Sequence, residues 1–530
     1  MVLNIWAFFL GNDTVVQKNW EGALEKVKGR LEKWKWLLPR MSYRGRTLII
    51  NNLVASCFWH RLACVDPPPD LLCKIQSLLV NFFWDHLHWV PQAVLFLPKD
   101  EGGHGLMQMQ SRTAAFRMQF IKRLLSGPSD VAWRAVSCSI LKTCGGLGLD
   151  KSLFLMTPHL MDTSGLPPFY RSLFKIWDLF IVQRNGPVTS LHWLLQEPLV
   201  FGARLDITAY GFHALTRILL NSKTVTLRNV FDLAGPNFVD IKKVADHLGV
   251  RSVRATAQFL DKWRAVLTVD DFKMLGEYCV EAAIPNEQDR FPDLILSPKL
   301  DGSIGPFLEP EMTLVLSSVS GKQLYQACVK VFNKRVLNDK VDTPWRTVLR
   351  LGHDIRPEWR SLYKPPLDKR VGDLQWRILH GAIAVNAFIS VLNQEVDQEC
   401  PFCPQRETIF HAFVQCIRLK PLFVVLEHLF NCFNKVFTME TFIFGFRYVQ
   451  RRQNECKLLN FILGQAKMAI YLSRKNKVNN QSGDDALILF SALIKYRILI
   501  DFRFYKLMQD LESFESIWCI HRALCTVVDN

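Results

Sequence analysis

Four side chains that can bind a metal ion follow one another in the pattern C-x2-C-x7-H-x4-C: Cys400, Cys403, His411 and Cys416. Two thiolates on a C-x2-C turn can reach one ion at about 2.3 Å, and a histidine with a third cysteine completes the Cys3His set of structural zinc sites. The alternative is four unrelated buried residues among 14 cysteines and 13 histidines, which the close spacing disfavours. The pattern predicts one structural Zn2+ in a closed site that stabilises the fold and does not activate water.

The spacing of the last two candidate ligands also predicts a backbone feature. His411 and Cys416 are five residues apart, which is about 140° around a regular α-helix, so they cannot share one of its faces. We expect any helix over residues 409–416 to end or to distort beside the metal. Loss of the metal is expected to unfold residues 344–450 and to leave the N-terminal helices largely intact.

No group of residues in the sequence suggests a set of acid, base or nucleophile for catalysis, so no catalytic residue is predicted. The two adjacent aspartate pairs are Asp270-Asp271 and Asp484-Asp485, and neither offers carboxylates on the rigid strands that a two-metal polymerase site needs. The Gly-rich segments 102–105 and 145–148 lack the Lys-Ser/Thr of a phosphate-binding P-loop and are interpreted as turns. As an isolated chain, the protein is not expected to be an enzyme.

Positive charge is concentrated in two segments of a chain whose formal net charge is +16. Residues 15–61 hold ten Lys/Arg and three Glu, and residues 447–477 hold eight Lys/Arg and one Glu, so each segment carries +7. Such segregation favours a polyanion-binding surface, because each phosphate contact releases condensed counterions. A surface that serves only solubility would usually be spread more evenly. The candidate phosphate contacts are Lys33, Lys35, Arg40, Arg44, Arg46, Arg451, Arg452, Lys467, Arg474, Lys475 and Lys477.

Three helices are expected to position the first basic segment. Apolar residues recur at steps of three and four over residues 20–34, and the lysines fall mostly off this stripe. Pro39 ends that helix, and Ser42 is placed to cap a second helix, expected over residues 47–62. A third helix follows Pro67-Pro68-Pro69 and covers residues 72–84. Together they predict a compact helical module with a basic face.

The later parts of the chain are also mainly helical by their pattern. A helix is expected over residues 255–267, another from Gly321, and a third with the apolar face Leu459, Ile462, Leu463, Ala466 and Ile470. A polar turn over residues 476–485 precedes a final helix. The predicted fold is mainly α, with several helical units, a small closed zinc domain and little regular sheet. The predicted divisions are 1–125 for the basic helical module, 126–335 for a connector, 336–450 for the zinc domain and 451–530 for a basic helical tail.

Composition excludes several classes of protein. Hydrophobic residues make up 49% and charged residues 22% of the chain, so wholesale disorder is excluded. No stretch of about 18 residues is free of charged or strongly polar residues, so no membrane span or membrane partner is predicted. Residues 1–10 lack a basic start and a small-residue cleavage site, so no secretory signal is expected and the thiols are expected to be reduced.

Several motifs resemble those of one family. Residues 359–364 and 369–381, which lead into the cysteine cluster, resemble the zinc-binding domain that follows the reverse transcriptase in non-LTR (LINE-type) retrotransposon polyproteins. Four other segments resemble motifs of the same family. They are residues 37–46, with Ser42 and Gly45-Arg46, then Phe82-Phe83-Trp84, residues 102–106 and the tail from Leu463 to Lys477. The resemblance covers residues 1–125 and 340–530, and it is strongest around the cysteine cluster.

The resemblance implies a place within a longer polyprotein. Members of the family are RNA-directed DNA polymerases, and their palm domain carries paired aspartates in a [Tyr/Phe]-x-Asp-Asp turn. The sequence of this chain has no such turn. The chain is therefore expected to begin just after the palm, with upstream reverse transcriptase and endonuclease domains as partners if it belongs to a longer polyprotein. The resemblance also implies nuclear residence, and otherwise the chain is expected in the cytoplasm.

The favoured function is binding of RNA or DNA, mainly through phosphates, by a C-terminal reverse transcriptase fragment that lacks palm and endonuclease. Basic helices would position the nucleic acid without reading its sequence. Aromatic residues near the basic ones, among them Trp36 and Tyr471, could stack on bases, although core packing is the alternative for each. The alternative function is a zinc-stabilised protein-interaction module derived from a transposon, without nucleic-acid binding, and salt-dependent binding of RNA or DNA separates the two.

Overall fold

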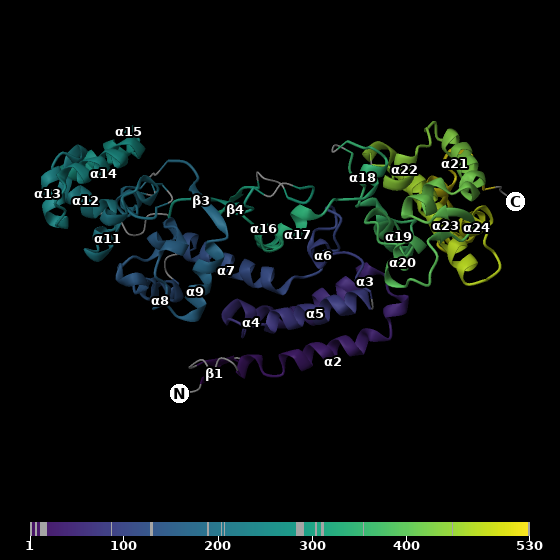
Figure 1. Cartoon of the computed structure of the whole chain (residues 1–530), viewed down its shortest axis with the longest axis horizontal. Helices are drawn as coiled ribbons and strands as arrows, with labels where there is room; N and C mark the ends of the chain where they lie inside the picture. The colour runs from purple at the N-terminus through teal and green to yellow at the C-terminus, as the bar shows by residue number, and fades with distance from the viewer. Residues whose placement is uncertain are drawn as a thin grey trace.

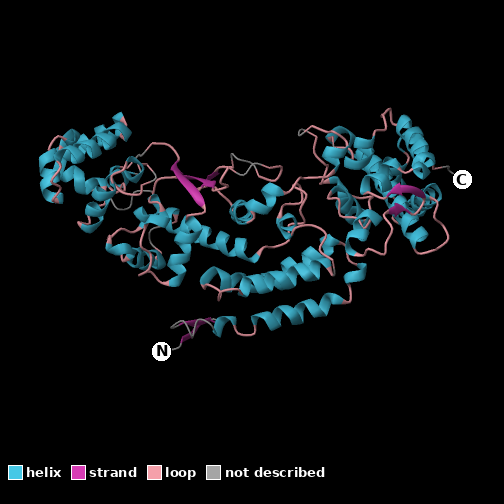
Figure 2. Cartoon of the chain, in the orientation of Figure 1, coloured by secondary structure: helices cyan, strands magenta, loops and turns pink. Residues whose placement is uncertain are grey.

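The structure is a computed structural model in which helices dominate, as the sequence predicts (Figure 2). The described parts are residues 3–5, 8–10, 18–85, 87–127, 131–187, 190–202, 204–205, 207–281, 291–302, 305–308, 312–352, 355–447 and 449–527. The molecule is elongated, with one helical lobe at each end and the N-terminal helices running beneath the middle (Figure 1). Strands occur only in short ladders within these residues.

The N-terminal helices form where the sequence predicts them. Helix α2 (Ala23–Lys35) ends before Pro39, and α3 (Tyr43–Leu48) begins after Ser42, whose hydroxyl accepts a hydrogen bond from the Gly45 amide at 3.3 Å. The second predicted helix is less regular than expected, because the chain passes through a π-helical segment, η3 (Ile49–Val54), and a 3-10 turn, η4 (Ala55–Phe58), before α4 (Trp59–Cys64). Helix α5 (Leu71–Trp84) then follows the three prolines.

The N-terminal helices share one hydrophobic core with the C-terminal lobe. Buried residues from Trp20 to Met109 and from Trp345 to Trp518 belong to the same apolar cluster. The helices of the C-terminal lobe are α18 (Trp345–Val348), α19 (Lys369–Leu379), α20 (Asn386–Leu392), α21 (Lys420–Cys432), α22 (Met439–Phe444), α23 (Gln453–Val478), α24 (Ala486–Leu507) and α25 (Leu511–Trp518). Elements far apart in sequence are therefore held together by burial of one continuous apolar surface.

The contact between these two parts is a buried polar and aromatic junction. The carbonyl of Gly102 accepts hydrogen bonds from the Trp376 indole at 2.8 Å and from the Nε2 atom of His380 at 2.9 Å. Gly102 has a φ of +87°, and an added Cβ would lie 2.9 Å from the ring of Trp359. Only glycine fits this position without a shift, because a side chain would be strained and would meet a buried ring.

The middle of the chain has a core of its own. Buried residues from Ala114 to Cys328 form a second apolar cluster, so the region expected to be a connector is a folded lobe. We call it the middle lobe, after its place in the sequence. Its strands β3 (Phe180–Arg184), β4 (Leu294–Pro298) and β5 (Leu314–Val315) form an antiparallel sheet in that order. Its helices are α7 (Met109–Ser126), α8 (Ala132–Leu141), α9 (Pro168–Trp177), α10 (Leu191–Leu195), α11 (His213–Asn221), α12 (Leu227–Ala234), α13 (Ile241–Leu248), α14 (Val253–Val266) and α15 (Val269–Glu281).

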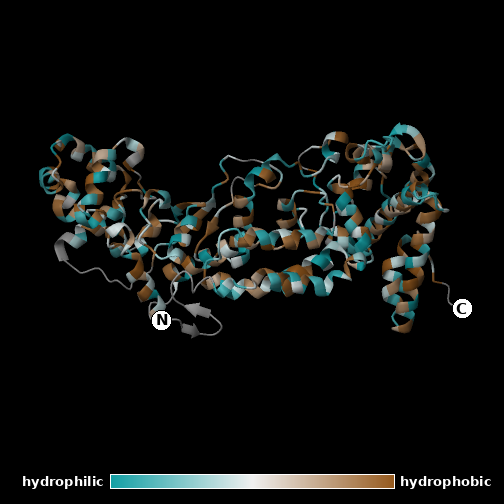
Figure 3. Cartoon of the chain, turned by 60° about the horizontal axis from the view of Figure 1, so that its bottom comes forward, coloured by the Kyte–Doolittle hydropathy of each residue, from teal (hydrophilic) through white to brown (hydrophobic). Residues whose placement is uncertain are grey.

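Three further helices connect the lobes: α6 (Gln92–Phe96), α16 (Gly321–Phe332) and α17 (Lys334–Asp339). Helix α16 packs along α7. Among the described residues no helix is long and apolar enough to cross a membrane, and hydrophobic and hydrophilic residues alternate along the helices (Figure 3). The mainly α fold with little regular sheet is confirmed, whereas the boundaries between the four predicted divisions stay predictions.

Candidate metal centre

The first two candidate ligands lie on a short hairpin. Strand β6 (Glu399–Cys400) pairs with β7 (Cys403–Arg406), and Cys400 and Cys403 are opposite each other in the antiparallel register. The two residues between them, Pro401 and Phe402, make the turn. Opposed residues at the end of an antiparallel pair hold their side chains close together, so the C-x2-C motif presents both thiols to one point.

The other two ligands lie on a distorted helical segment, as their spacing predicts. Residues His411–Gln415 form a π-helix, η11, and Cys416 leaves the helix with φ −60° and ψ 126°. The amide of Cys416 donates to the carbonyl of His411 at 2.9 Å. The wider turn and the helix end bring the imidazole and the thiol to one side, which a regular α-helix could not do.

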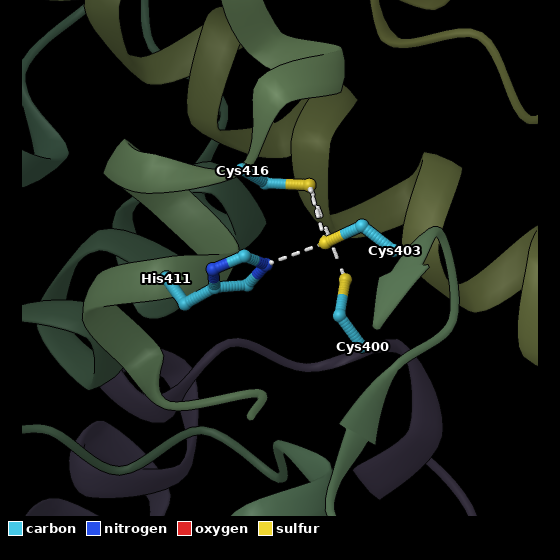
Figure 4. Close-up of side chains that lie close together, drawn as sticks. All are labelled: Cys400, Cys403, His411 and Cys416. Atoms are coloured by element: carbon cyan, nitrogen blue, oxygen red, sulfur yellow. Dashed lines mark hydrogen bonds between the residues drawn. The ribbon is translucent and has the colours of Figure 1, made fainter. Parts of the chain in front are cut away.

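The four ligand atoms converge (Figure 4). The Sγ atom of Cys416 lies 3.9 Å from the Sγ atoms of both Cys400 and Cys403, and the Nε2 atom of His411 lies 3.2 Å from the Sγ atom of Cys403. All four atoms lie within 4.8 Å of one another. Tetrahedral zinc with Zn–S bonds of about 2.3 Å places its sulfur ligands about 3.8 Å apart, so the four side chains could hold one metal ion.

Burial favours the uncharged forms of the Cys400 thiol and the His411 imidazole. Burial raises the pKa of the Cys400 thiol to about 12, and the neighbouring thiols of Cys416 and Cys403 act in the same direction. Burial also lowers the pKa of the His411 imidazole. A bound cation would reverse this balance for the thiols, because metal ligation requires thiolates and releases their protons.

Neighbouring side chains fix the ligand-bearing segments to the rest of the lobe. Glu407, 1% exposed, lies between the hairpin and the π-helix, and its carboxylate accepts hydrogen bonds from Arg474 of α23 at 2.5 and 2.7 Å. The guanidinium of Arg418 lies 3.4 Å from the centre of the Phe402 ring. Sequence reasoning missed Glu407 and Arg418, although both are charged residues within a few positions of a predicted ligand.

The predicted phosphate contacts of the first basic segment divide into two groups. Lys33, Lys35 and Arg40 are exposed, at the C-terminal end of α2 and in the turn after it. Arg46, by contrast, is 9% exposed and donates to the carbonyls of Phe83 and Leu38 at 2.8 and 2.9 Å. Arg44 is partly buried with its guanidinium 3.8 Å from the centre of the Tyr363 ring. These two arginines therefore serve the core junction between N-terminal helices and C-terminal lobe.

The second basic segment divides in the same way. Arg451, Arg452, Lys475 and Lys477 are exposed, at the two ends of α23. Lys467 is 1% exposed, and its ammonium group donates to the side chain of Gln375 at 3.2 Å and to the carbonyl of Ile443 at 3.0 Å.

Lys467 and Arg474 are therefore removed from the set of accessible cations. Lys467 lies inside the core, and Arg474 is committed to the buried carboxylate of Glu407. Periodicity places both on a basic helix, but it does not reveal which of its cations face inward.

The second aspartate of each adjacent pair has a structural role. The carboxylate of Asp271 accepts a hydrogen bond from the Thr268 amide at 2.8 Å and pairs with Arg204. Asp485 caps α24 by accepting from the Leu487 amide at 2.7 Å and the Ile488 amide at 3.0 Å. Both roles are those of residues at helix N-termini.

Comparison with known proteins gives one informative similarity. The chain is 31% identical over 523 residues to the transposon TX1 uncharacterized 149 kDa protein of Xenopus laevis, an alignment that covers 97% of this chain and 40% of that protein. The chain thus spans less than half the length of this relative. No family model matches the chain. The similarity supports a transposon origin for nearly all of the sequence described above.

Proposed function

We propose that this chain is the nucleic-acid-binding C-terminal part of a LINE-type retrotransposon reverse transcriptase, with a zinc-stabilised C-terminal lobe. The observation that carries the proposal is the similarity to a transposon protein over 97% of the chain. Its extent means that the similarity is not confined to one segment of the chain but runs through nearly all of it. The retrotransposon class rests on the motifs that lead into the cysteine cluster, and the nucleic-acid role rests on that resemblance together with the two basic segments.

We assign zinc to the cluster on the chemistry of its donors. Three thiols and one imidazole within 4.8 Å of one another suit a tetrahedral ion that accepts sulfur and nitrogen, and oxygen-preferring cations such as Mg2+ and Ca2+ are poorly matched. With all four positions supplied by Cys400, Cys403, His411 and Cys416, the ion would cross-link the hairpin to the π-helix. Its role would be structural.

Nucleic acid would contact the exposed cations. Seven of the predicted residues are exposed: Lys33, Lys35, Arg40, Arg451, Arg452, Lys475 and Lys477. Trp36, which is 71% exposed, follows Lys35 and offers an uncovered ring on which a base could stack. A single-stranded or partly unpaired substrate would use both features, because phosphates meet the cations and unpaired bases meet the ring.

Chemistry would be supplied by other domains. In this proposal an upstream palm and endonuclease act on the nucleic acid that this chain holds, and the assembly works in the nucleus, where chromosomal targets lie. The chain itself would position template or target through phosphates without reading sequence.

The proposal is tested by binding of labelled RNA, single-stranded DNA and duplex DNA to the purified zinc-loaded chain. Fluorescence anisotropy titrations between about 50 and 200 mM salt should give a linear fall of the logarithm of the affinity with the logarithm of salt. A chain that binds none of the three probes, or binds them without salt dependence, would contradict the proposal. That result would favour the alternative, a zinc-stabilised protein-interaction module.

A further inference from the structure

A hollow of about 460 Å³ lies where three distant segments meet. Its walls come from the loop that follows α6, from the first two turns of α16, and from Arg360, which immediately precedes the short helix η10 (Ser361–Tyr363). The volume falls within the range of about 300–1,000 Å³ that small-ligand sites occupy. It is large enough for a phosphate group together with its sugar and base.

The charged groups around this hollow are mostly positive. Lys99, Lys322 and Arg360 line it, and Asp100 is the carboxylate among its lining residues. The Nη2 atom of Arg360 lies 2.6 Å from an Oδ atom of Asp100, which neutralises one cation. Within the part of the chain that the structure describes, Lys99 and Lys322 have no ion-pair partner. The single carboxylate of Asp100, which is paired with Arg360 and also lies in the field of Lys322, therefore offsets the three cations only in part.

Arg44, which does not line the hollow, adds to the positive potential at Lys99. Burial lowers the pKa of the Lys99 ammonium group, and the charge of Arg44 lowers it further. Arg44 is held in place over the Tyr363 ring at 3.8 Å, so its charge is a fixed feature of the junction. Because like charges near Lys99 disfavour its charged form, an anion between them would be stabilised.

The remaining walls are uncharged, and hydrogen bonds hold the aromatic ring among them in place. The phenolic oxygen of Tyr325 accepts a hydrogen bond from the Gln108 amide at 2.9 Å and donates to the Leu106 carbonyl at 3.4 Å. Gly105 adopts a φ of +65° at the edge of the hollow, and no heavy atom lies within 4 Å of the place where its Cβ would be. A fixed aromatic ring, an open backbone edge and two unpaired cations together make a place for a ligand that is anionic at one end and flat at the other.

We propose that this hollow binds a phosphate group carried by a nucleotide unit, either within a nucleic-acid strand or as a free nucleotide. Lys99 and Lys322 contact the phosphate as point charges, and Tyr325 borders the sugar or base. Binding of a phosphate within a nucleic-acid strand rests on the proposed function. It also extends that function, because none of the three lining cations belongs to the two basic segments. Binding of a free nucleotide does not depend on the proposed function.

The test compares three variants of the zinc-loaded chain with two probes, a labelled single-stranded oligonucleotide and a fluorescent adenosine triphosphate analogue. The double variant Lys99→Gln/Lys322→Gln removes both unpaired cations and keeps side-chain length. If a strand occupies the hollow, the variant's affinity for the single-stranded oligonucleotide should fall about tenfold and its salt slope should decrease by about 1.4, or about 0.7 for each lost phosphate contact. A control double variant, Lys223→Gln/Lys242→Gln, changes two exposed lysines of the middle lobe and should leave both quantities unchanged.

A variant of opposite sign sharpens the test. Asp100→Asn removes the carboxylate of the hollow and releases Arg360 from its ion pair, so the affinity for the occupying probe should rise several-fold. Circular dichroism and zinc content should match the wild type in all variants, since every changed side chain is exposed.

The outcomes separate the two proposals. If the wild type binds the oligonucleotide and the hollow variants do not change the affinity for either probe, the hollow is not a phosphate site and the proposed function stands. If the wild type binds only the nucleotide and Lys99→Gln/Lys322→Gln abolishes that binding, the hollow is a nucleotide site and the proposed function fails. If the wild type binds neither probe, both proposals fail.

Discussion

A metal ion bound by three thiolates and one imidazole would leave one net negative charge in a partly buried site, and such a charge needs a counter-charge nearby. Arg418 is placed to provide it. Burial lowers the pKa of this guanidinium, whereas the thiolate forms of Cys416 and Cys400 raise it. The guanidinium of Arg418 also donates a hydrogen bond to the hydroxyl of Ser473 in α23. Arg418 therefore links the electrostatics of the candidate zinc site to the position of the longest helix of the C-terminal lobe.

We expect Cys403→Ser to abolish zinc binding. A hydroxyl is a poor replacement for a thiolate ligand, and the three remaining donors cannot close the tetrahedron. Elemental analysis after chelator challenge should find about one zinc per wild-type chain and close to none in the variant. Cys432→Ser, which changes an exposed cysteine of α21, is the matched control and should keep the metal. Full zinc retention by Cys403→Ser would show that the cluster is not the site.

Lys467 is a buried cation that has no carboxylate partner among the described residues, and this makes the stability of the protein depend on pH. Burial lowers its pKa from 10.5 to about 7 in the folded state. Between about pH 7 and 10.5 the unfolded chain therefore binds more protons than the folded one, so stability rises with pH across this window. The slope cannot exceed about 1.4 kcal/mol per pH unit. Below pH 7 the folded state holds the buried charge at full cost.

Lys467→Met should remove this pH dependence and raise the free energy of unfolding at neutral pH by a few kcal/mol. Urea unfolding midpoints measured from pH 7 to pH 9.5 would show a smaller rise for the variant than for the wild type. Lys475→Met, an exposed lysine of the same helix, should keep the wild-type slope. Equal slopes for the wild type and Lys467→Met would mean that the ammonium group is solvated in the folded state.

The sequence could predict the four ligand positions and the helix distortion between His411 and Cys416, because both follow from local spacing. It could not predict that Lys467, Arg474 and Arg46 face inward, since each is buried by a segment distant in sequence. Arg474 forms an ion pair with Glu407, and Arg46 donates a hydrogen bond to the Phe83 carbonyl. A count of charges in a window treats inward and outward cations alike, and only the tertiary fold separates them.

Helix α2 is the element that best suits a nucleic-acid strand. Its apolar stripe buries Ala23, Val27 and Leu31, and its lysines face outward. The triple variant Lys33→Gln/Lys35→Gln/Arg40→Gln should reduce the salt slope of nucleic-acid binding by up to about 2.7, or about 0.9 for each lost phosphate contact on duplex DNA. Lys35 also lies 3.8 Å from Glu32 in an exposed ion pair, which is worth little.

The matched control for α2 is the triple variant Lys223→Gln/Lys242→Gln/Lys273→Gln, which removes the same charge from the middle lobe. Equal slopes for the wild type and the α2 variant would show that α2 does not contact phosphate. Equal losses in both triple variants would indicate a response to net charge alone, because long-range attraction does not distinguish the positions of the lysines.

Periodicity predicted the helical elements well, and it failed where structure depends on contacts between them. Helices α5 and α14 lie within two residues of the expected ranges, and α16 begins at the expected Gly321. The middle region was expected to be a connector, because Pro/Gly breaks interrupt its apolar runs. Its strand β3 pairs with β4, more than a hundred residues later, and such long-range pairing has no local signature.

The arrangement of the two cores makes the ends of the chain one cooperative unit and the middle another. Helix α5 buries its apolar face in the same cluster as α19 and α23, and Tyr43 of α3 packs against that cluster. Polar contacts reinforce it, since the Tyr43 amide donates to Asp373 at 2.9 Å and the Tyr363 hydroxyl donates to the same carboxylate at 2.7 Å. From the sequence, loss of zinc was expected to spare the N-terminal helices; a shared core predicts that they are affected.

Removal of zinc should therefore increase amide hydrogen exchange beyond residues 399–416. We expect the loss of protection to spread through α19 and α23, and from there to α3 and α5, because regions packed in one core open together. Helix α14, which belongs to the separate middle core, should keep its protection and serves as the internal control. Exchange measured by mass spectrometry on zinc-loaded and chelated protein tests this. Unchanged protection of α3 and α5 would mean that loosening of the C-terminal lobe does not destabilise the N-terminal helices, and that these helices fold independently of the metal.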